Sequence, residues 1–245
     1  VDYEIQFRFA AEFSINQILG VGGFGIVFEA TNTLDKWSYA VKRISVQAVF
    51  LREETKALEE VQALAKLDHP NIVRYNSTWI EKPPLQWQSV RYEGSFIYIQ
   101  MQVHDLKLYH ISDKYFFQLC NYSLSRWLEE NTTPNSRALS RMKSWFKQIV
   151  SAVAYIHKNN LIHRDLKPSN ILFSDRDHLK LCDLGIATER RSENGEETTL
   201  ARSNIGTPLY MSPEQRSNSK YGSKTDVFAL GLILAELCVV MTTSQ

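Results

Sequence analysis

The stretch that decides the fold is HRDLKPSN, residues 163–170. It places an acid, Asp165, a lysine, Lys167, and an amide, Asn170, within six residues, and Pro168 stiffens the backbone between them. A loop with these groups can activate a hydroxyl, neutralise a phosphate and hold a metal ion. Solvated turns also contain such residues, so the chemical interpretation depends on the rest of the chain.

The flanking residues predict a rigid frame for this loop. Apolar residues recur at i, i+4, i+8 and i+11 from Trp145 onward, which predicts an amphipathic helix over residues 141–157. Residues 171–173 and 179–181 are short apolar runs and predict a hairpin. The loop should therefore lie between a long helix and a hairpin. A shorter helix is expected at residues 123–130.

The composition is that of a soluble globular protein. Of the 245 residues, 44% are hydrophobic and 22% are charged, enough to build one or two cores. The 28 basic and 27 acidic residues give a net charge of +1, so no overall field favours nucleic acid or an anionic membrane as a partner. The three cysteines form no C-x-x-C pair, which argues against a disulfide framework or a zinc site and fits a reducing compartment. The longest apolar run, residues 228–240, is interrupted by Gly231 and Glu236 and predicts a buried helix.

A glycine-rich turn interrupts the first strand pattern, which covers residues 13–46. The turn is GVGGFG, residues 20–25, and glycine lets backbone N–H groups approach a polyphosphate because it has no Cβ. A plain hairpin is an equally common explanation of such a turn. A strand follows it where a dinucleotide-binding fold requires a helix, so the order of elements argues against that fold.

A lysine and a glutamate form a second candidate pair. Lys42 ends an apolar strand run downstream of the glycines, at a spacing that makes it a candidate phosphate ligand. Residues 51–67 predict a helix on which Glu60 lies near the apolar edge, where a carboxylate needs a partner. Lys42 is the partner we expect. Two further strands are predicted at residues 72–80 and 95–102.

These pieces occur in a fixed order along the chain. The order is the glycine turn, Lys42, Glu60, residues 163–170, Asp183-Leu184-Gly185 and Ser212-Pro213-Glu214. In order and spacing the set resembles the signature motifs of protein kinases. The resemblance implies an α+β, bilobal fold with a β-rich N-lobe and a helical C-lobe.

The resemblance also implies how ATP is bound. Lys42 would hold the α- and β-phosphates and be oriented by Glu60. The residues that would surround ATP are Leu19, Gly20, Val21, Gly22, Gly23, Phe24, Gly25, Ile26, Val27, Ala40, Lys42, Met101, Cys120 and Leu172.

The same resemblance assigns roles in the opening stretch. Asp165 would accept the proton of the substrate hydroxyl, and Lys167 would neutralise the transferring phosphoryl group. Asn170 and Asp183 would bind Mg²⁺. A lysine at position 167 indicates a serine/threonine kinase. Leu184 stands where kinases usually have phenylalanine, but the apolar character is kept and the metal ligand is unchanged.

Three longer strings narrow the resemblance. Residues 66–75, 98–102 and 206–215 are similar to the kinases of the alpha subunit of translation initiation factor 2, most of all to the PKR-like endoplasmic-reticulum kinases. This implies repression of translation under stress and an active homodimer formed through the N-lobes. It also implies that this segment binds no nucleic acid and lies on the cytosolic side, with any anchor in the endoplasmic-reticulum membrane belonging to other parts of the parent protein.

The polar residues 189–204 predict a mobile surface loop that would carry activating phosphorylation. Thr199 and Ser203 are the first candidate sites, and Thr198 is the next. Thr207 is expected to shape the substrate pocket. Plain solvation of the loop is the alternative explanation of these hydroxyls.

Two departures from the kinase pattern leave a second function open. We predict an N-lobe at residues 1–102, an insertion at the hinge at residues 103–118, and a C-lobe at residues 119–245 that is truncated after its central helix. The insertion would displace Cys120 from the adenine, and the truncation would expose an apolar helix face. The chain is therefore either an active kinase or a catalytically silent variant that only binds a partner.

Overall fold

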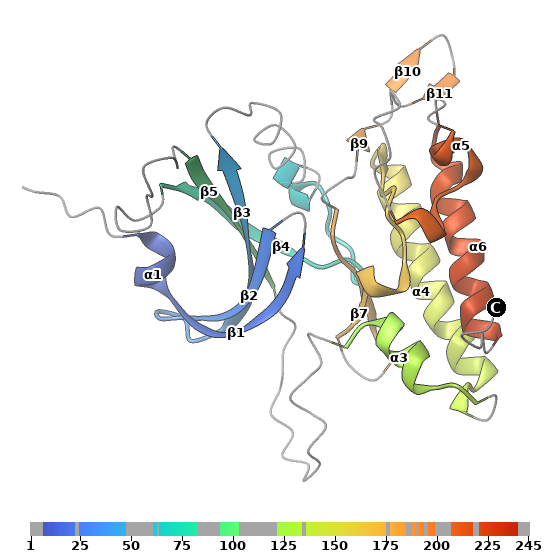
Figure 1. Cartoon of the computed structure of the whole chain (residues 1–245), viewed down its shortest axis with the longest axis horizontal. Coiled ribbons are helices and arrows are strands. Elements are labelled where there is room, and N and C mark those ends of the chain that lie inside the picture. The colour runs from blue at the N-terminus through green and yellow to red at the C-terminus, as the bar shows by residue number, and fades with distance from the viewer. Residues whose placement is uncertain are drawn as a thin grey trace, which may run out of the picture. The chain divides into compact units, whose positions relative to one another are not determined.

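The computed structural model describes residues 7–22, 25–47, 61–62, 64–82, 94–102, 122–133, 136–174, 177–184, 188–189, 191–193, 196–198, 207–217 and 221–239. The chain divides into two compact units. Unit 1 comprises Val1–Ala65 and Arg74–Asp105, and unit 2 comprises Lys66–Val73 and Leu106–Gln245. Unit 1 is built on a sheet and unit 2 mainly on helices (Figure 1), so the predicted α+β fold class is confirmed. The predicted boundaries of the insertion lie outside the described residues.

Unit 1 contains one antiparallel five-stranded sheet of order β1-β2-β3-β5-β4. Its strands are β1 (Phe13–Gly22), β2 (Gly25–Asn32), β3 (Ser38–Gln47), β4 (Tyr75–Glu81) and β5 (Gly94–Gln102). The predicted strands at residues 13–46 and 95–102 are confirmed. The predicted strand at residues 72–80 begins later, at Tyr75, because Ile72 pairs with Leu181 in unit 2.

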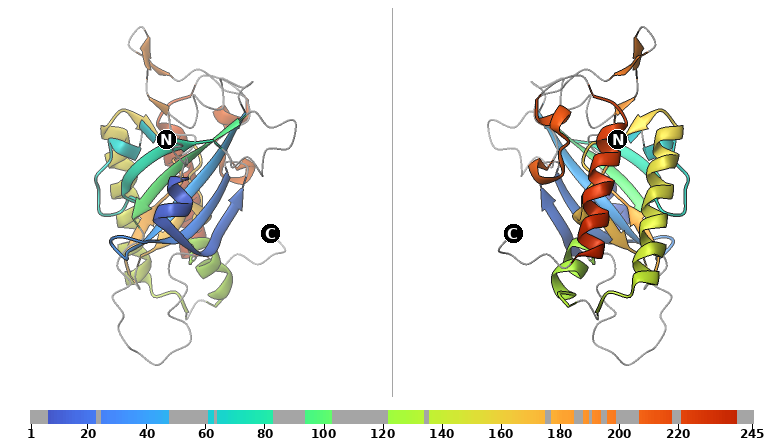
Figure 2. Two further views of the ribbon diagram at one scale, coloured as in Figure 1. Left: turned by 90° about the vertical axis from the view of Figure 1, so that its left-hand side faces the viewer. Right: turned by 90° about the vertical axis from the view of Figure 1, so that its right-hand side faces the viewer.

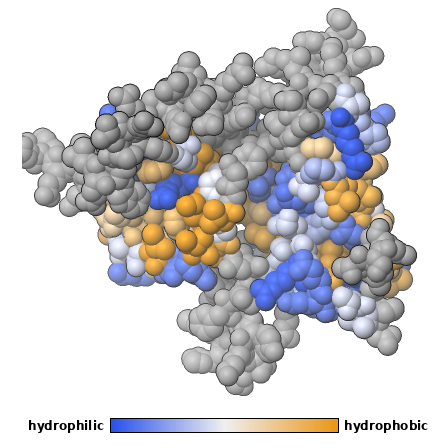
Figure 3. Space-filling model, viewed as in Figure 1, coloured by the Kyte–Doolittle hydropathy of each residue, from blue (hydrophilic) through white to orange (hydrophobic). Residues whose placement is uncertain are grey.

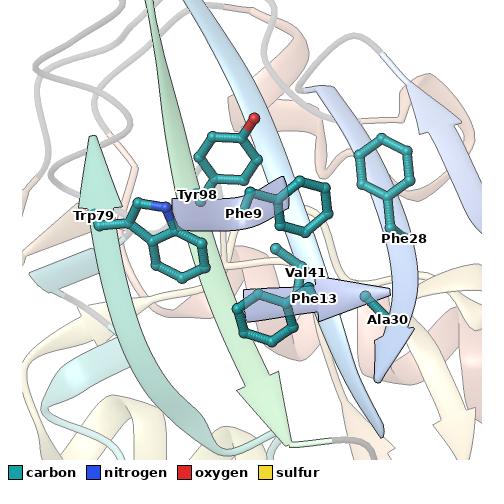
Figure 4. Close-up of a cluster of buried hydrophobic side chains, with 7 residues drawn as sticks. All are labelled: Phe9, Phe13, Phe28, Ala30, Val41, Trp79 and Tyr98. Carbon is teal, nitrogen blue, oxygen red and sulfur yellow. The ribbon is translucent and has the colours of Figure 1, made fainter. Parts of the chain in front are cut away.

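The core of unit 1 is aromatic. One cluster of buried side chains forms it (Figure 4), made up of Phe9, Phe13, Phe28, Ala30, Val41, Trp79 and Tyr98. Phe9 comes from a short helix, α1 (Arg8–Glu12), and its ring centroid lies 4.8 Å from that of Tyr98. Glu81 holds the helix in place, since its Oε1 accepts hydrogen bonds from the Phe9 backbone N–H at 2.8 Å and from Trp79 Nε1 at 2.5 Å. The sequence pattern did not predict α1.

Unit 2 is organised around two long helices, α4 (Leu139–Lys158) and α6 (Lys224–Cys238), which lie side by side (Figure 2). The remaining elements are α3 (Leu124–Glu130), β6 (Leu161–Ile162), η4 (Pro168–Asn170), β7 (Ile171–Phe173), β8 (Leu179–Leu181), β9 (Thr188–Glu189), β10 (Arg191–Glu193), β11 (Glu196–Thr198), η5 (Pro208–Tyr210) and α5 (Pro213–Arg216).

The patterns around the opening stretch are confirmed. Trp145, Ile149, Val153 and Ile156 of α4 are all buried, and β7 and β8 form the predicted hairpin. Within the predicted surface loop at residues 189–204, β10 and β11 pair as a short hairpin that the sequence pattern did not predict. Each strand of this hairpin is only three residues long, too short for a strand period to be recognised in the sequence.

The short segment Lys66–Val73 belongs to unit 2 although unit 1 elements flank it. His69 Nε2 lies 3.1 Å from Ser151 Oγ of α4, and Asn71 Nδ2 donates to the Leu179 carbonyl oxygen at 2.9 Å. Of the predicted helix at residues 51–67, the structure describes residues 61–62 and 64–67. Residues 61–62 and 64–65 are helical, whereas residues 66–67 lie beyond the helix end. Glu60 lies outside the described residues.

Apolar surface is exposed on both units (Figure 3). In unit 2 an open groove of about 330 Å³ runs between α4 and α6, where Met142, Phe146 and Val150 face Leu234 and Cys238. This groove agrees with the expectation of an exposed apolar helix face. Among the described helices, none combines the length and the apolar character needed to cross a bilayer.

Candidate active site

The backbone of the stretch 163–170 is anchored by a buried acid of α6. Asp226 is 1% exposed, and its two carboxylate oxygens accept the backbone N–H groups of His163 and Arg164, each at 2.9 Å. Arg164 has a φ of 70°, a backbone conformation that residues other than glycine seldom adopt. The two hydrogen bonds hold this strained turn just before Asp165.

The side chain of His163 joins the loop to the segment after β8. Its Nδ1 accepts the backbone N–H of Asp165 at 3.3 Å, so Nδ1 carries no proton and the proton on Nε2 points to the Cys182 carbonyl oxygen, 3.3 Å away. Asn170 makes a second link, because its carbonyl oxygen accepts the Cys182 backbone N–H at 2.9 Å. Asp165, Asn170 and Asp183 are therefore held in one region of unit 2.

The Asp165 carboxylate is surrounded by donors. Oδ2 accepts from Lys167 Nζ at 2.7 Å and from Asn170 Nδ2 at 3.3 Å. Oδ1 accepts from the backbone N–H of Thr207 at 2.8 Å and from its hydroxyl at 2.9 Å. Lys167 Nζ also donates to Thr207 Oγ1 at 2.7 Å, which closes the network. The carboxylate therefore has one fixed orientation, with a hydroxyl group at Oδ1 and an ammonium group at Oδ2.

Asn170 and Asp183 offer the ligand chemistry that Mg²⁺ prefers. The Asn170 amide nitrogen donates to the Asp165 carbonyl oxygen at 2.9 Å, which leaves its amide oxygen for a cation. Asp183 adds a carboxylate from a residue with a φ of 59°. Within the described parts of the chain, no three His, Cys, Asp or Glu side chains gather as a metal site. The donor set fits Mg²⁺, which commonly takes one or two protein ligands and completes its shell with water and phosphate oxygens.

The residues predicted to bind ATP divide between the two units. In unit 1, Lys42 pairs in register with Val27, and Ala40 pairs with Met101, so these four side chains share one face of the sheet. Phe28 and its neighbours in the aromatic core occupy the other face. Lys42 is buried, at 7% exposure.

Two paired antiparallel strands flank the glycine turn, as the strand pattern predicted. Leu19, Gly20, Val21 and Gly22 lie on β1, and Gly25, Ile26 and Val27 on β2. Gly25 has a φ of 117°, and an added Cβ would collide with the Arg43 carbonyl, so only glycine fits. At Gly20 a Cβ would meet open space within the described residues. Gly23, Phe24 and Cys120 lie outside the described residues, and Leu172 lies on β7 in unit 2.

The protein-kinase-domain model matches residues 13–245. The chain belongs to the protein kinase family. It is 39% identical to the interferon-induced, double-stranded RNA-activated protein kinase of Rattus norvegicus over 252 residues, which covers 99% of this chain and 44% of the relative. It is 40% identical to the eukaryotic translation initiation factor 2-alpha kinase pek-1 of Caenorhabditis elegans over 141 residues, which covers 52% of this chain and 13% of the relative. Nek4 of Mus musculus, a serine/threonine-protein kinase, is 30% identical over 94% of this chain and 25% of its own length.

The kinase chain thus spans less than half the length of these curated relatives. The predicted protein kinase family is confirmed. The relatives include an initiation factor 2-alpha kinase and a serine/threonine-protein kinase, which supports the predicted subfamily and the serine/threonine class. The finer resemblance to the PKR-like endoplasmic-reticulum kinases stays a prediction, because the pek-1 match covers only 52% of the kinase chain, whereas a double-stranded RNA-activated kinase matches 99% of it.

Sequence reasoning missed Asp226 and underestimated Thr207. Asp226 stands just before the apolar run at residues 228–240, and an acid at the head of an apolar helix is a signal that it has a buried partner. Thr207 was expected to shape the substrate pocket, and the structure shows that it contacts both Asp165 and Lys167.

Proposed function

We propose that this chain is the catalytic domain of a serine/threonine kinase that transfers the γ-phosphoryl group of ATP to the alpha subunit of translation initiation factor 2 and so represses translation under stress. The observation that carries the proposal is the closed network of Asp165, Lys167, Asn170 and Thr207 in unit 2. The similarity to initiation factor 2-alpha kinases supports the choice of substrate.

The network supplies the two things that phosphoryl transfer needs, which are alignment and charge neutralisation. The substrate hydroxyl donates its proton to Asp165 as its oxygen attacks the γ-phosphorus, and the bond from that phosphorus to the ADP oxygen breaks. Thr207 Oγ1 donates a hydroxyl hydrogen bond to Asp165 Oδ1, and this contact supports the proposal that Asp165 accepts the substrate hydroxyl. The Lys167 ammonium, 2.7 Å from Asp165 Oδ2, stands beside the path of the transferred group and offsets its negative charge.

Asn170 and Asp183 would hold Mg²⁺, which when bound neutralises the ATP phosphates. Lys42, oriented by Glu60, would hold the α- and β-phosphates, and the shared face of Val27, Ala40 and Met101 would contact the adenine. These roles rest on the family resemblance and on the common side of the sheet that carries them.

A catalytically silent variant that only binds a partner is the alternative function. The intact hydrogen-bond network around Asp165 favours the enzyme, because a silent chain has no requirement for it. Residues 103–118, one of the two reasons for considering the alternative, lie outside the described residues.

The test is phosphate transfer from ATP to the purified alpha subunit, with three proteins compared. The intact chain is expected to be active, and Asp165→Asn to lower the rate about 1,000-fold because the base is lost. Transfer that survives Asp165→Asn contradicts the assignment of the base. A silent intact chain that becomes active after deletion of residues 103–118 supports the alternative function.

We propose three further properties of the parent kinase on the basis of its subfamily. It forms an active homodimer through its N-lobes and autophosphorylates Thr199, Ser203 or Thr198. Its kinase domain lies on the cytosolic side, and its other parts anchor it in the endoplasmic-reticulum membrane. This segment binds no nucleic acid. Sedimentation of the chain with and without ATP, followed by phosphopeptide mapping, tests the dimer and the sites together; a monomer that is phosphorylated to the same extent contradicts the dimer.

A further inference from the structure

One arginine joins the C-terminal ends of two helices of unit 2. Arg137 is a partly buried residue in the connection that follows α3. On the α3 side, its Nε donates to the Asn131 carbonyl oxygen at 2.7 Å, and its Nη2 donates to that of Leu128 at 3.2 Å. On the α6 side, its Nη1 donates to the carbonyl oxygens of Glu236 at 2.5 Å and Val239 at 3.0 Å. One side chain therefore bridges two helix ends that are far apart in the sequence.

A guanidinium group suits this place between α3 and α6. The last four carbonyl groups of a helix have no partner within the helix and carry the negative end of its dipole. Neither α3 nor α6 has a basic residue in its own last turn. Arginine presents five N–H donors in one plane, whereas the ammonium group of lysine presents three from a single point. Arg137 therefore supplies one cation to both helix ends.

The opposite end of α3 is joined to the candidate active site. Ser123, just before α3, forms a β-bridge with Leu172 of β7, and the Phe173 backbone N–H donates to the Tyr122 carbonyl oxygen at 3.0 Å. The helix α3 also contacts η4, which ends at Asn170. The start of α3 thus supports the two residues of unit 2 that would contact the adenine and the magnesium ion, Leu172 and Asn170.

Aromatic rings continue this link inside unit 2. The Arg137 guanidinium carbon lies 5.6 Å from the centroid of the Trp127 ring on α3. The Trp127 ring meets that of Trp145 edge-on at 4.9 Å between centroids, and Trp145 meets Phe173 at 4.8 Å. Phe173 directly follows Leu172 on β7. Because a packed interior transmits strain, a displacement of α3 would reach β7 through these rings as well as through the backbone.

We propose that Arg137 is a positioning residue for ATP binding. By holding the end of α3 against α6, it keeps the start of α3 against β7 and η4, and so keeps Leu172 and Asn170 in place for the adenine and the metal ion. The inference rests on the proposed kinase function. Within the described residues Arg137 makes no hydrogen bond to Leu172 or Asn170, so it acts through α3.

The test compares two substitutions of Arg137 in the full chain. Arg137→Met keeps a long side chain but removes the charge and every donor. Arg137→Lys keeps the charge, but its three donors cannot reach four carbonyl groups on two helices. Arg126→Met is the matched control, because Arg126 also lies on α3 but pairs at 3.0 Å with Glu130 of the same helix, and its side chain is 42% exposed.

We expect Arg137→Met to raise the KM for ATP about fivefold while the KM for the protein substrate stays within about twofold. A loss of folded protein alone would lower kcat and leave the KM for ATP unchanged. Arg137→Lys should recover less than half of the effect, and Arg126→Met should leave both KM values unchanged. An unchanged KM for ATP in Arg137→Met overturns the proposal. So does a KM for ATP in Arg137→Lys equal to that of the parent chain, which also decides the matter if the methionine variant does not fold.

Two readouts do not require phosphate transfer. The Phe173 backbone amide, which donates to Tyr122 across the junction of α3 and β7, should exchange its hydrogen faster in Arg137→Met than in the parent chain. Binding of ADP with Mg²⁺, measured by calorimetry, should weaken by about the same factor as the KM for ATP rises. If the parent chain transfers no phosphate but both readouts respond as expected, the kinase function fails while the positioning role of Arg137 stands. Unchanged exchange at Phe173 or unchanged ADP affinity overturns the positioning role itself.

Discussion

The aromatic core of unit 1 and the catalytic loop of unit 2 are both buried, but they are held together in different ways. In unit 1, Phe9, Phe13, Trp79 and Tyr98 stack at ring-centroid distances from 4.8 to 5.8 Å. In unit 2, the loop is ordered by directional hydrogen bonds that converge on Asp226. Packing energy spreads over many contacts, whereas a hydrogen-bonded carboxylate sets the geometry of a few atoms. Substitutions in the aromatic core should therefore affect mainly stability, whereas substitutions around the catalytic loop should affect both stability and activity.

The largest effect is expected from Asp226→Ala. It leaves the buried N–H groups of His163 and Arg164 without an acceptor and should lower the free energy of unfolding by about 4 kcal/mol. Phosphate transfer should fall by about 100-fold or more at temperatures where the variant is folded. Thermal unfolding and the transfer assay measure the two effects.

A surface carboxylate provides the control for Asp226. Asp177 is 64% exposed at its side chain and pairs with Arg141 at 2.6 Å. Asp177→Ala should change the free energy of unfolding by less than about 1 kcal/mol. Equal losses in the two variants would contradict the view that burial decides the importance of these acids.

Phe9→Ala should have the next largest effect, and on stability alone. Its ring contacts those of Phe13, Phe28 and Tyr98, so truncation opens a cavity and should destabilise unit 1 by about 3 kcal/mol. Hydrogen exchange of β2 and β5 measures the loss within unit 1. The rate of phosphate transfer well below the melting temperature should be unchanged, and a fall there would contradict the contrast between the two regions.

Thr207→Val, in contrast to Phe9→Ala, should lower activity and leave stability nearly unchanged. Valine keeps the shape and the backbone N–H that donates to Asp165 at 2.8 Å, but it removes the hydroxyl that bridges Asp165 and Lys167. We expect about a tenfold fall in kcat, with a melting temperature close to that of the parent chain. Thr207→Ser restores the hydroxyl and should restore kcat; a low kcat in the serine variant would show that the methyl group, and not the hydroxyl, is required.

The smallest effect that we expect is a pH dependence of stability caused by His69. Burial and, secondly, the charge of Lys180 hold the pKa of His69 below its ordinary value. The unfolded chain then binds more protons than the folded chain once the pH falls to about 6.5, so stability decreases as the pH drops through that value and levels off below the folded pKa. Protonation would also block Nδ1, which accepts the Asn71 backbone N–H at 3.0 Å.

His69→Asn isolates this effect because asparagine does not titrate in this range and still offers an oxygen acceptor. Thermal unfolding at pH 7.5, 6.5 and 5.5 should show a steeper loss for the parent chain than for the variant. Parallel profiles would contradict the assignment to His69.

Much of the fold could be predicted because its elements carry strong local periods. The helix with Trp145, Ile149, Val153 and Ile156 repeats its apolar positions over three turns, and the first strands alternate clearly. The five-residue α1 could not be predicted, because a helix that short is stable only through the packing of Phe9 and the acceptor on Glu81. The start of β4 was misplaced for a similar reason, since Ile72 follows a partner, Leu181, that lies far along the chain.

The sequence by itself determined which chemical groups this kinase brings to catalysis. Asp165, Lys167 and Asn170 fall within six residues, so their types and their common loop follow from chain order alone. Only the tertiary structure decided how that loop is aimed. Thr207 and Asp226 contact it from other elements, and His157 of α4 contacts Asp226 in turn. These contacts join residues 42 to 69 positions apart and depend on tertiary packing, which no local period in the sequence encodes.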